Sequence, residues 1–154
     1  MDSDIVYPAI LLGKDGLRLA RDPEHLTTIP RSLLTAGVFD DQWLVDSIGR
    51  ARHIKEGHLP AGSIGLMSRL RELWNWSYSI RMELVCDGEI TFVSVDELKE
   101  RLLVSLAGRP ANLAAWNPGN INFDQLKEGL KTAQTFDEVF HLVQEFDTIR
   151  PELL

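Results

Sequence analysis

The chain has 154 residues, a length that fits one domain, and 44% of them are hydrophobic, which is ordinary for a soluble globular protein. The formal net charge is −7, so the basic composition typical of nucleic-acid-binding proteins is absent. A single cysteine excludes an internal disulfide and a cysteine-based zinc site, and no apolar run is long enough to span a bilayer. We therefore expect a soluble, cytoplasmic domain that binds neither nucleic acid nor a membrane.

The first predicted elements form a hairpin near residues 5–20. Residues 5–12 (IVYPAILL) are mostly apolar, which is typical of a strand, and residues 17–20 (LRLA) return after a turn that contains two glycines. Pro8 has no backbone N–H to donate to a neighbouring strand, so it indicates that the first strand lies at the edge of its sheet.

Three further elements are expected in the first half of the chain. Pro30 and Gly37 are typical of the start and the end of a short helix over residues 31–36. Residues 42–55 contain an apolar segment, a Ser-Ile-Gly turn and a segment rich in basic side chains, and they predict a second hairpin. Residues 63–74 have apolar positions at helical spacing and favour a helix, although some of these positions also fit a strand.

A third hairpin is predicted near residues 78–93. Apolar and largely polar side chains alternate from Tyr78 to Cys86, which is the pattern of a strand with one buried face. Asp87-Gly88 follows as the turn signal. A three-residue turn from Cys86 to Gly88 brings the apolar residues of both strands onto one face, whereas a two-residue turn separates them. That face is predicted to consist of Ile80, Met82, Leu84, Ile90 and Phe92.

Three amphipathic helices are predicted in the C-terminal part of the chain. Residues 94–97 (Ser-x-x-Glu) and 135–138 (Thr-x-x-Glu) are capping boxes, in which two side chains satisfy each other's backbone N–H groups at the start of a helix. Gly129 lowers the helix propensity of the segment that contains it. The expected helices cover residues 94–107, 122–133 and 135–147. All these elements together predict a single α+β domain, with helices packed on a mainly antiparallel sheet of about four to six strands.

No catalytic, metal-binding or nucleotide-binding motif is present in the sequence. His53 and His58 are five residues apart with Gly57 between them, so they do not share one helix face as the histidines of a zinc-protease motif do. Cys86 has no neighbouring group in the sequence that would activate its thiol. The sequence therefore predicts no metal and no cofactor.

Negative charge is concentrated toward the C-terminus. Residues 122–154 carry seven acids and three bases, a net charge of −4, whereas residues 48–81 carry six bases and two acids, a net charge of +4. Charges that lie on solvated faces and pair with one another explain this pattern most simply. The alternative is an acidic helical surface that docks a basic protein. Its possible contact residues are Asp124, Glu128, Asp137, Glu138, Glu145 and Asp147.

Two classes of function fit these observations. The first is a small acidic protein-binding domain of the kind found among the inhibitors and toxin-neutralising (immunity-like) proteins of bacteria, which need only complementary shape and charge. The second is an enzyme or small-ligand-binding protein with a site assembled from scattered residues. Its candidates are Trp74, Trp76, Arg81 and His53. The missing catalytic motifs favour the first class.

Overall fold

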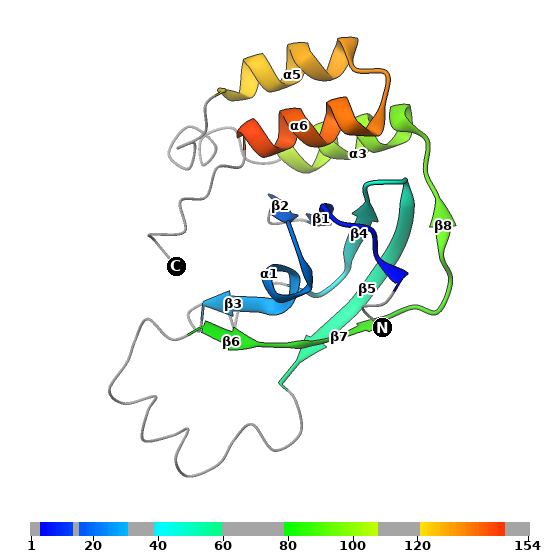
Figure 1. The fold of residues 1–154 in the computed structure, drawn as a ribbon, viewed down its shortest axis with the longest axis vertical. Coiled ribbons are helices and arrows are strands. Elements are labelled where there is room, and N and C mark those ends of the chain that lie inside the picture. Colours follow the sequence, from blue (N-terminus) through cyan, green and yellow to red (C-terminus); the bar gives the residue numbers. More distant parts are fainter. Residues whose placement is uncertain (1–3, 14–15, 31–38, 60–78, 108–120, 147–154) are drawn as a thin grey trace.

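The computed structural model describes residues 4–13, 16–30, 39–59, 79–107 and 121–146 (Figure 1). These residues form a six-stranded sheet and a two-stranded sheet, with three helices gathered against one face of the larger sheet. Every strand pair among them is antiparallel, so the predicted α+β class with a mainly antiparallel sheet is confirmed. The helices predicted over residues 31–36 and 63–74 lie outside the described part of the chain.

The larger sheet has the strand order β2-β1-β4-β5, and two successive segments, β7 and β8, both pair with β5. Its strands are β1 (Ala9–Gly13), β2 (Gly16–Ala20), β4 (Gln42–Asp46), β5 (Arg50–His58), β7 (Glu83–Cys86) and β8 (Thr91–Phe92). The smaller sheet pairs β3 (Thr28–Pro30) with β6 (Ser79–Arg81). The predicted hairpins near 5–20 and 42–55 are confirmed, because β1 pairs with β2 and β4 pairs with β5.

The prediction that the first strand lies at a sheet edge is wrong. β1 lies between β2 and β4 and is paired along both sides. Pro8 does not prevent this, because the strand begins one residue later, at Ala9. The proline therefore precedes the ladder and removes none of its hydrogen bonds.

The third predicted hairpin, near residues 78–93, is also wrong. β7 and β8 do not pair with each other; they run in the same direction along one edge of β5, with Cys86 opposite Ile54 and Thr91 opposite Ala51. The intervening residues 87–90 face only residues 52 and 53, so the chain bulges away from β5 there.

The single apolar face predicted for this hairpin is divided as a result. Met82 and Leu84 are buried, whereas Ile90 is 42% exposed and Phe92 is 75% exposed. The long β5 offers an unpaired edge to the whole segment, and pairing along that edge replaces the local turn that Asp87-Gly88 suggested.

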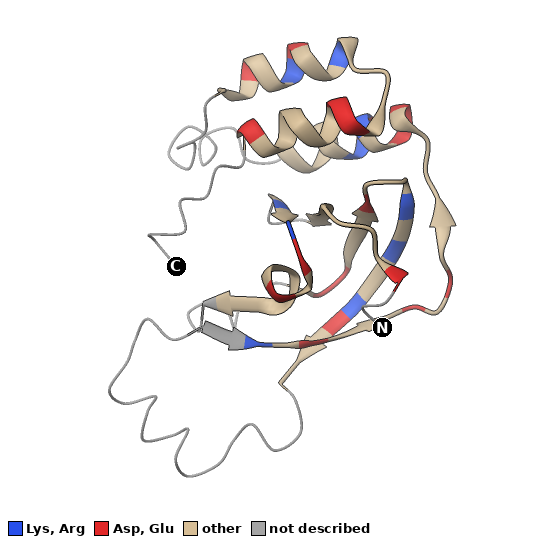
Figure 2. Ribbon diagram, viewed as in Figure 1, with Lys and Arg blue, Asp and Glu red and all other residues tan. Residues whose placement is uncertain are grey.

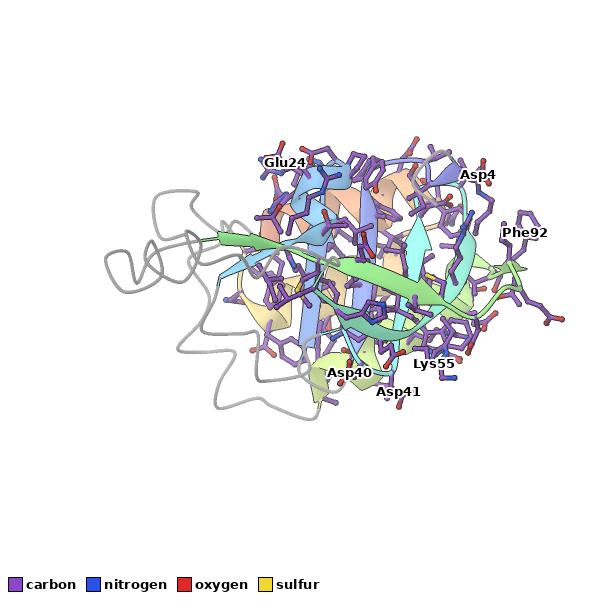
Figure 3. The ribbon with its side chains drawn as sticks, turned by 90° about the horizontal axis from the view of Figure 1, so that it is seen from below. Asp4, Glu24, Asp40, Asp41, Lys55 and Phe92 are labelled. Carbon is purple, nitrogen blue, oxygen red and sulfur yellow. The ribbon has the colours of Figure 1, made fainter. Side chains whose placement is uncertain are left out.

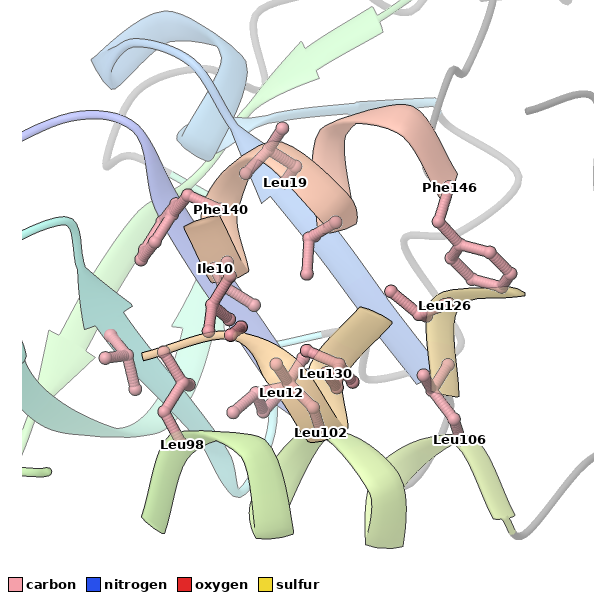
Figure 4. Close-up of a cluster of buried hydrophobic side chains, with 14 of the residues drawn as sticks. Ile10, Leu12, Leu19, Leu98, Leu102, Leu106, Leu126, Leu130, Phe140 and Phe146 are labelled. Atoms are coloured by element: carbon pink, nitrogen blue, oxygen red, sulfur yellow. The ribbon is translucent and has the colours of Figure 1, made fainter. Parts of the chain in front are cut away.

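Both faces of the larger sheet are buried. On one face, α3 (Val95–Ala107), α5 (Phe123–Thr132) and α6 (Phe136–Phe146) form a helix layer (Figure 1). The apolar cluster beneath that layer, the helix-side core, includes Ile10, Leu12, Leu98, Leu102, Leu126 and Phe140 (Figure 4). On the opposite face, α1 (Pro23–Thr27) and the smaller sheet cover the far-side core, which includes Ala9, Leu11, Leu26, Ile29, Leu44 and Ile54.

The three helices predicted in the C-terminal part are confirmed to within one residue at each end. At the start of α6, Glu138 N–H donates to Thr135 Oγ1 (3.2 Å) and Thr135 N–H donates to Glu138 Oε2 (3.3 Å), as the capping box predicts. At the start of α3, Glu97 N–H donates to Ser94 Oγ (3.2 Å). None of the described helices combines the length and the apolar character needed to cross a membrane.

A buried carboxylate, Asp46, fixes the turn between β4 and β5. Its side chain accepts hydrogen bonds from the backbone N–H groups of Ile48 (3.2 Å) and Arg50 (2.9 Å), and from Nε of Arg50 at 2.8 Å. It also accepts from Val6 N–H at 3.2 Å, which ties the segment before β1 to this turn. A carboxylate that is only 3% exposed is stable there because four donors replace its water.

Candidate functional site

A histidine held between two carboxylates is the most distinctive polar group of the described residues. His53, on β5, has its Nδ1 2.7 Å from Asp87 Oδ2 and its Nε2 2.9 Å from Asp41 Oδ1. Asp41 lies just before β4, and Asp87 lies in the bulge that follows β7. The imidazole therefore bridges the central strands and the edge segment of the sheet.

The two carboxylates also determine the charge of the imidazole. The hydrogen bond to Asp87, and then the hydrogen bond to Asp41, raise the pKa of His53 above the usual value for histidine. In the protonated form both ring nitrogens donate, one to each carboxylate, so neither nitrogen is left as a base or a metal ligand. Among the described residues no group of His, Cys, Asp and Glu is arranged to hold a metal ion.

Trp43 places an aromatic surface beside this histidine. Trp43 pairs with His53 across β4 and β5, so the two side chains share a face of the sheet, with ring centroids 5.2 Å apart and an interplanar angle of 51°. Arg101 of α3 lies with its Cζ 4.5 Å from the centre of the Trp43 ring, a cation–π distance. Glu97, one turn earlier, accepts from Arg101 Nη2 at 2.7 Å.

The backbone at Asp41 adopts an unusual conformation. Asp41 has φ 56°, in the left-handed region, and its N–H donates to Lys55 O at 3.3 Å. Aspartate tolerates this region better than most residues, although it still carries a conformational cost. Figure 3 shows Asp40, Asp41 and Lys55 along the same edge of the molecule.

A groove of about 670 Å³ lies beside Trp43, a volume within the range of roughly 300–1,000 Å³ that is typical of small-ligand sites. It runs between the end of β1, the start of β4 and the outer side of α3. Its lining residues are Leu12, Gly13, Asp41, Trp43, Glu100, Arg101, Val104 and Ser105. Val104 is 75% exposed, so this wall is open to solvent. The groove combines apolar side chains with the carboxylates of Asp41 and Glu100.

Nothing in this groove resembles an activated nucleophile. The Ser105 hydroxyl donates to the backbone oxygen of Gly13 at 2.9 Å, which closes β1 against α3. A nucleophilic serine needs a base within hydrogen-bond reach, and His53 is hydrogen-bonded to Asp41 and Asp87 instead.

The acidic residues predicted for a partner surface lie on α5 and α6, except Asp147, which is outside the described residues. Figure 2 shows acidic and basic positions alternating along α5, whereas α6 has acidic positions toward its two ends and no lysine or arginine. The Lys131 ammonium lies 2.6 Å from Glu128 and lowers the pKa of that carboxyl. Glu145 lies 3.5 Å from His141, and Glu138 caps α6. Asp124 and Asp137 lie in the first turns of their helices, where carboxylates are favoured.

Of the scattered residues proposed for a ligand site, the structure describes Arg81 and His53, which lie in different sheets. Arg81 lies in β6, opposite Thr28, whereas His53 lies in β5, opposite Trp43. Trp74 and Trp76 are outside the described residues. Sequence reasoning missed the Asp41–His53–Asp87 group. Only the position of His53 could be anticipated from the sequence, because the second predicted hairpin, with a three-residue turn at 47–49, places Trp43 opposite His53.

Comparison with protein-family models, with curated proteins and with solved structures finds no match for this chain. The function must therefore be inferred from the chemistry of the groove and its surroundings.

Proposed function

We propose that this domain binds a basic segment of another protein in the groove beside Trp43. The observation that carries the proposal is the composition of the groove, in which an aromatic ring and the exposed Val104 lie next to the carboxylates of Asp41 and Glu100. A segment that combines arginine or lysine with apolar side chains would find partners for both. Tryptophan is among the residues that contribute most to protein interfaces.

The charges around the groove support a basic partner more than an acidic one. Asp40, Asp41, Asp87 and Glu100 all have exposed carboxylates. Two cations beside the groove are already engaged: Arg101 lies on Trp43 and pairs with Glu97, and His53 pairs with two carboxylates. Carboxylates on the rim would attract a basic segment and speed its association.

The acidic surface of α5 and α6 remains an alternative location for the same kind of partner. Three of its carboxylates already make contacts within the helix layer, to Lys131, to His141 and at the start of α6. Such contacts are typical of a helix face that is exposed to solvent. They therefore favour the groove as the location of the partner. In either location the domain would work as a small acidic protein that covers a basic partner, as inhibitors and toxin-neutralising proteins do.

A binding experiment with defined peptides tests this proposal. The probes are a fluorescein-labelled decapeptide that alternates arginine with leucine, and the same peptide with glutamate in place of arginine. We expect fluorescence anisotropy to show binding of the basic peptide only, with an affinity that falls about tenfold or more when salt is raised from about 0.05 to 0.5 M. In the NMR spectrum, the indole N–H of Trp43 should shift as the basic peptide is added.

Two charge reversals locate the contact. Glu100→Lys in the groove should weaken binding of the basic peptide by about tenfold, because it places a like charge beside the peptide. Glu128→Lys changes the net charge by the same amount on α5 and should alter the affinity by less than about twofold. If Glu128→Lys weakened binding more than Glu100→Lys did, the partner would be assigned to the α5–α6 surface. Equal binding of both peptides, or of neither, would show that the proposed function is wrong.

A further inference from the structure

The contacts of His53 join two parts of the sheet that no strand pair links directly. Asp41 precedes β4 and is held to β5 by its backbone bond to Lys55. Asp87 begins the bulge between β7 and β8, and its N–H donates to His53 O at 2.9 Å. The His53 ring lies between the two carboxylates, 2.7 Å from one and 2.9 Å from the other.

We propose that His53 is a pH-sensitive clasp that holds Asp41 against the edge segment when it is protonated and releases Asp41 toward the groove when it loses its proton. The consequence for binding rests on the proposed function: the groove beside Trp43 gains one negative charge and binds a basic segment more tightly.

The release follows from the chemistry of imidazole. Protonated imidazole has two N–H groups and can donate to both carboxylates, whereas neutral imidazole has one N–H and one lone pair. When the proton leaves for solvent, one of the two carboxylates faces a lone pair and is repelled. The His53 side chain is 24% exposed, so the proton has a path to water.

Asp41 is the carboxylate that should leave. Its distance to the ring, 2.9 Å, is longer than the 2.7 Å of Asp87. Its backbone also carries the left-handed conformation, φ 56°, whose cost is recovered when the residue relaxes. Asp41 lines the groove, so its release changes the charge and the shape of the proposed binding site directly.

Other charged groups around the ring do not compete with the two carboxylates. From α3, Arg101 lies on Trp43 and is paired with Glu97, and Glu100 faces the groove. On β5 itself, Lys55 has an exposed side chain. The hydrogen bonds to Asp87 and Asp41 raise the pKa of His53, so the switch operates above the usual titration range of histidine, about pH 6.5.

An NMR titration of the wild-type protein tests the clasp without any ligand. We expect the imidazole of His53 to titrate above the usual histidine value of about pH 6.5, and the backbone amide of Asp41 to shift over the same pH range as the His53 ring. Asp87→Asn should lower the titration point of His53, whereas Asp137→Asn, which removes an exposed carboxylate on α6, should leave it unchanged. Titration of His53 at or below about pH 6.5, or an Asp41 amide that does not follow the ring, would overturn the clasp.

Peptide binding then tests the link to the groove. The affinity for the arginine-leucine peptide should rise severalfold as the pH passes upward through the titration of His53, and His53→Gln should abolish that rise. Binding that is independent of pH would overturn the link while leaving the proposed function in place. A clasp that titrates as expected in a protein that binds no basic peptide would overturn the proposed function and keep the clasp.

Discussion

Gly49, in the turn between β4 and β5, lies against the ring of Phe136 at the start of α6, so closely that a Cβ on Gly49 would be 2.5 Å from Cζ of Phe136. Gly49 also has φ 84°, a conformation that other residues rarely adopt. The contact joins the sheet to the helix layer at a point where no larger residue fits.

Gly49→Ala should therefore lower the free energy of unfolding by about 2–4 kcal/mol, from the left-handed backbone and from overpacking against Phe136. Urea denaturation followed by circular dichroism measures the change. Gly88→Ala is the control, because a Cβ at Gly88 meets nothing within 4 Å. A small change at position 88 is compatible with this view, whereas equal losses at the two positions would contradict it.

Gly129 lowers the helix propensity of α5, but it favours the packing of α5 on α6. A Cβ there would lie 2.6 Å from Cδ2 of Leu142, so the glycine permits α5 to approach α6 closely. We expect Gly129→Ala to destabilise the wild-type protein by about 1 kcal/mol, because overpacking exceeds the gain in helix propensity. With Leu142→Ala in place, the same substitution should be stabilising. A double-mutant cycle from four urea curves measures the coupling, and its absence would refute the close packing.

The buried carboxylate of Asp46 should be among the groups to which stability is most sensitive. Asp46→Asn keeps the shape but removes the charge opposite Arg50 and places an amide NH₂ near donors. The expected loss is about 2–4 kcal/mol. Glu83→Gln, at an exposed position in β7, serves as the matched control and should change stability by less than about 0.5 kcal/mol. Indistinguishable thermal unfolding of the two variants would contradict this role.

α3 offers a direct test of the helix-side core. Leu102 is 0% exposed and Val104, in the same helix, is 75% exposed. Leu102→Ala should cost about 2–5 kcal/mol through the lost apolar contacts and the cavity that remains. Val104→Ala should change the free energy of unfolding by no more than about 0.5 kcal/mol. If both substitutions had the small effect, α3 would not pack on the sheet as described.

The stability of the protein should depend on pH through His53. Its two carboxylates raise the pKa of His53 in the folded protein above the unfolded value of about 6.5. The folded state therefore binds the proton more tightly, so the stabilisation is complete below about pH 6.5 and is lost as the pH rises through the folded pKa. We expect the difference in unfolding free energy between wild type and His53→Gln to be largest near about pH 6 and to shrink toward about pH 9. A difference that grows with pH would contradict the assignment.

The features that the sequence predicted well depend on residues close together in the chain. The capping box of Thr135 and Glu138 needs contacts only three residues apart, and the stripe of apolar residues in α6 follows from the helical repeat. The β4–β5 hairpin is likewise short-range. These parts require no knowledge of the rest of the fold.

The strand pairing at the edge of the sheet could not be predicted from the local sequence pattern. Asp87-Gly88 has the composition of a hairpin turn, and two apolar segments flank it. Whether those segments pair with each other or with a third strand depends on which edge is open, and here the long β5 provides that edge. The candidate site was missed for the same reason, because Asp87 reaches His53 only through this pairing.

β1 lies between two apolar cores, and this position affects how firmly its register with the neighbouring strands is determined. Ile10 and Leu12 enter one core while Ala9 and Leu11 enter the other, so a slip of one residue would exchange one apolar set for another. Hydrophobicity alone would tolerate that slip. The contacts that oppose it are polar or steric: Val6 N–H donates to Asp46, and a Cβ on Gly13 would come within 2.9 Å of the Gln42 side chain. In this apolar strand, a carboxylate and a glycine therefore help to select one alignment where hydrophobicity alone does not.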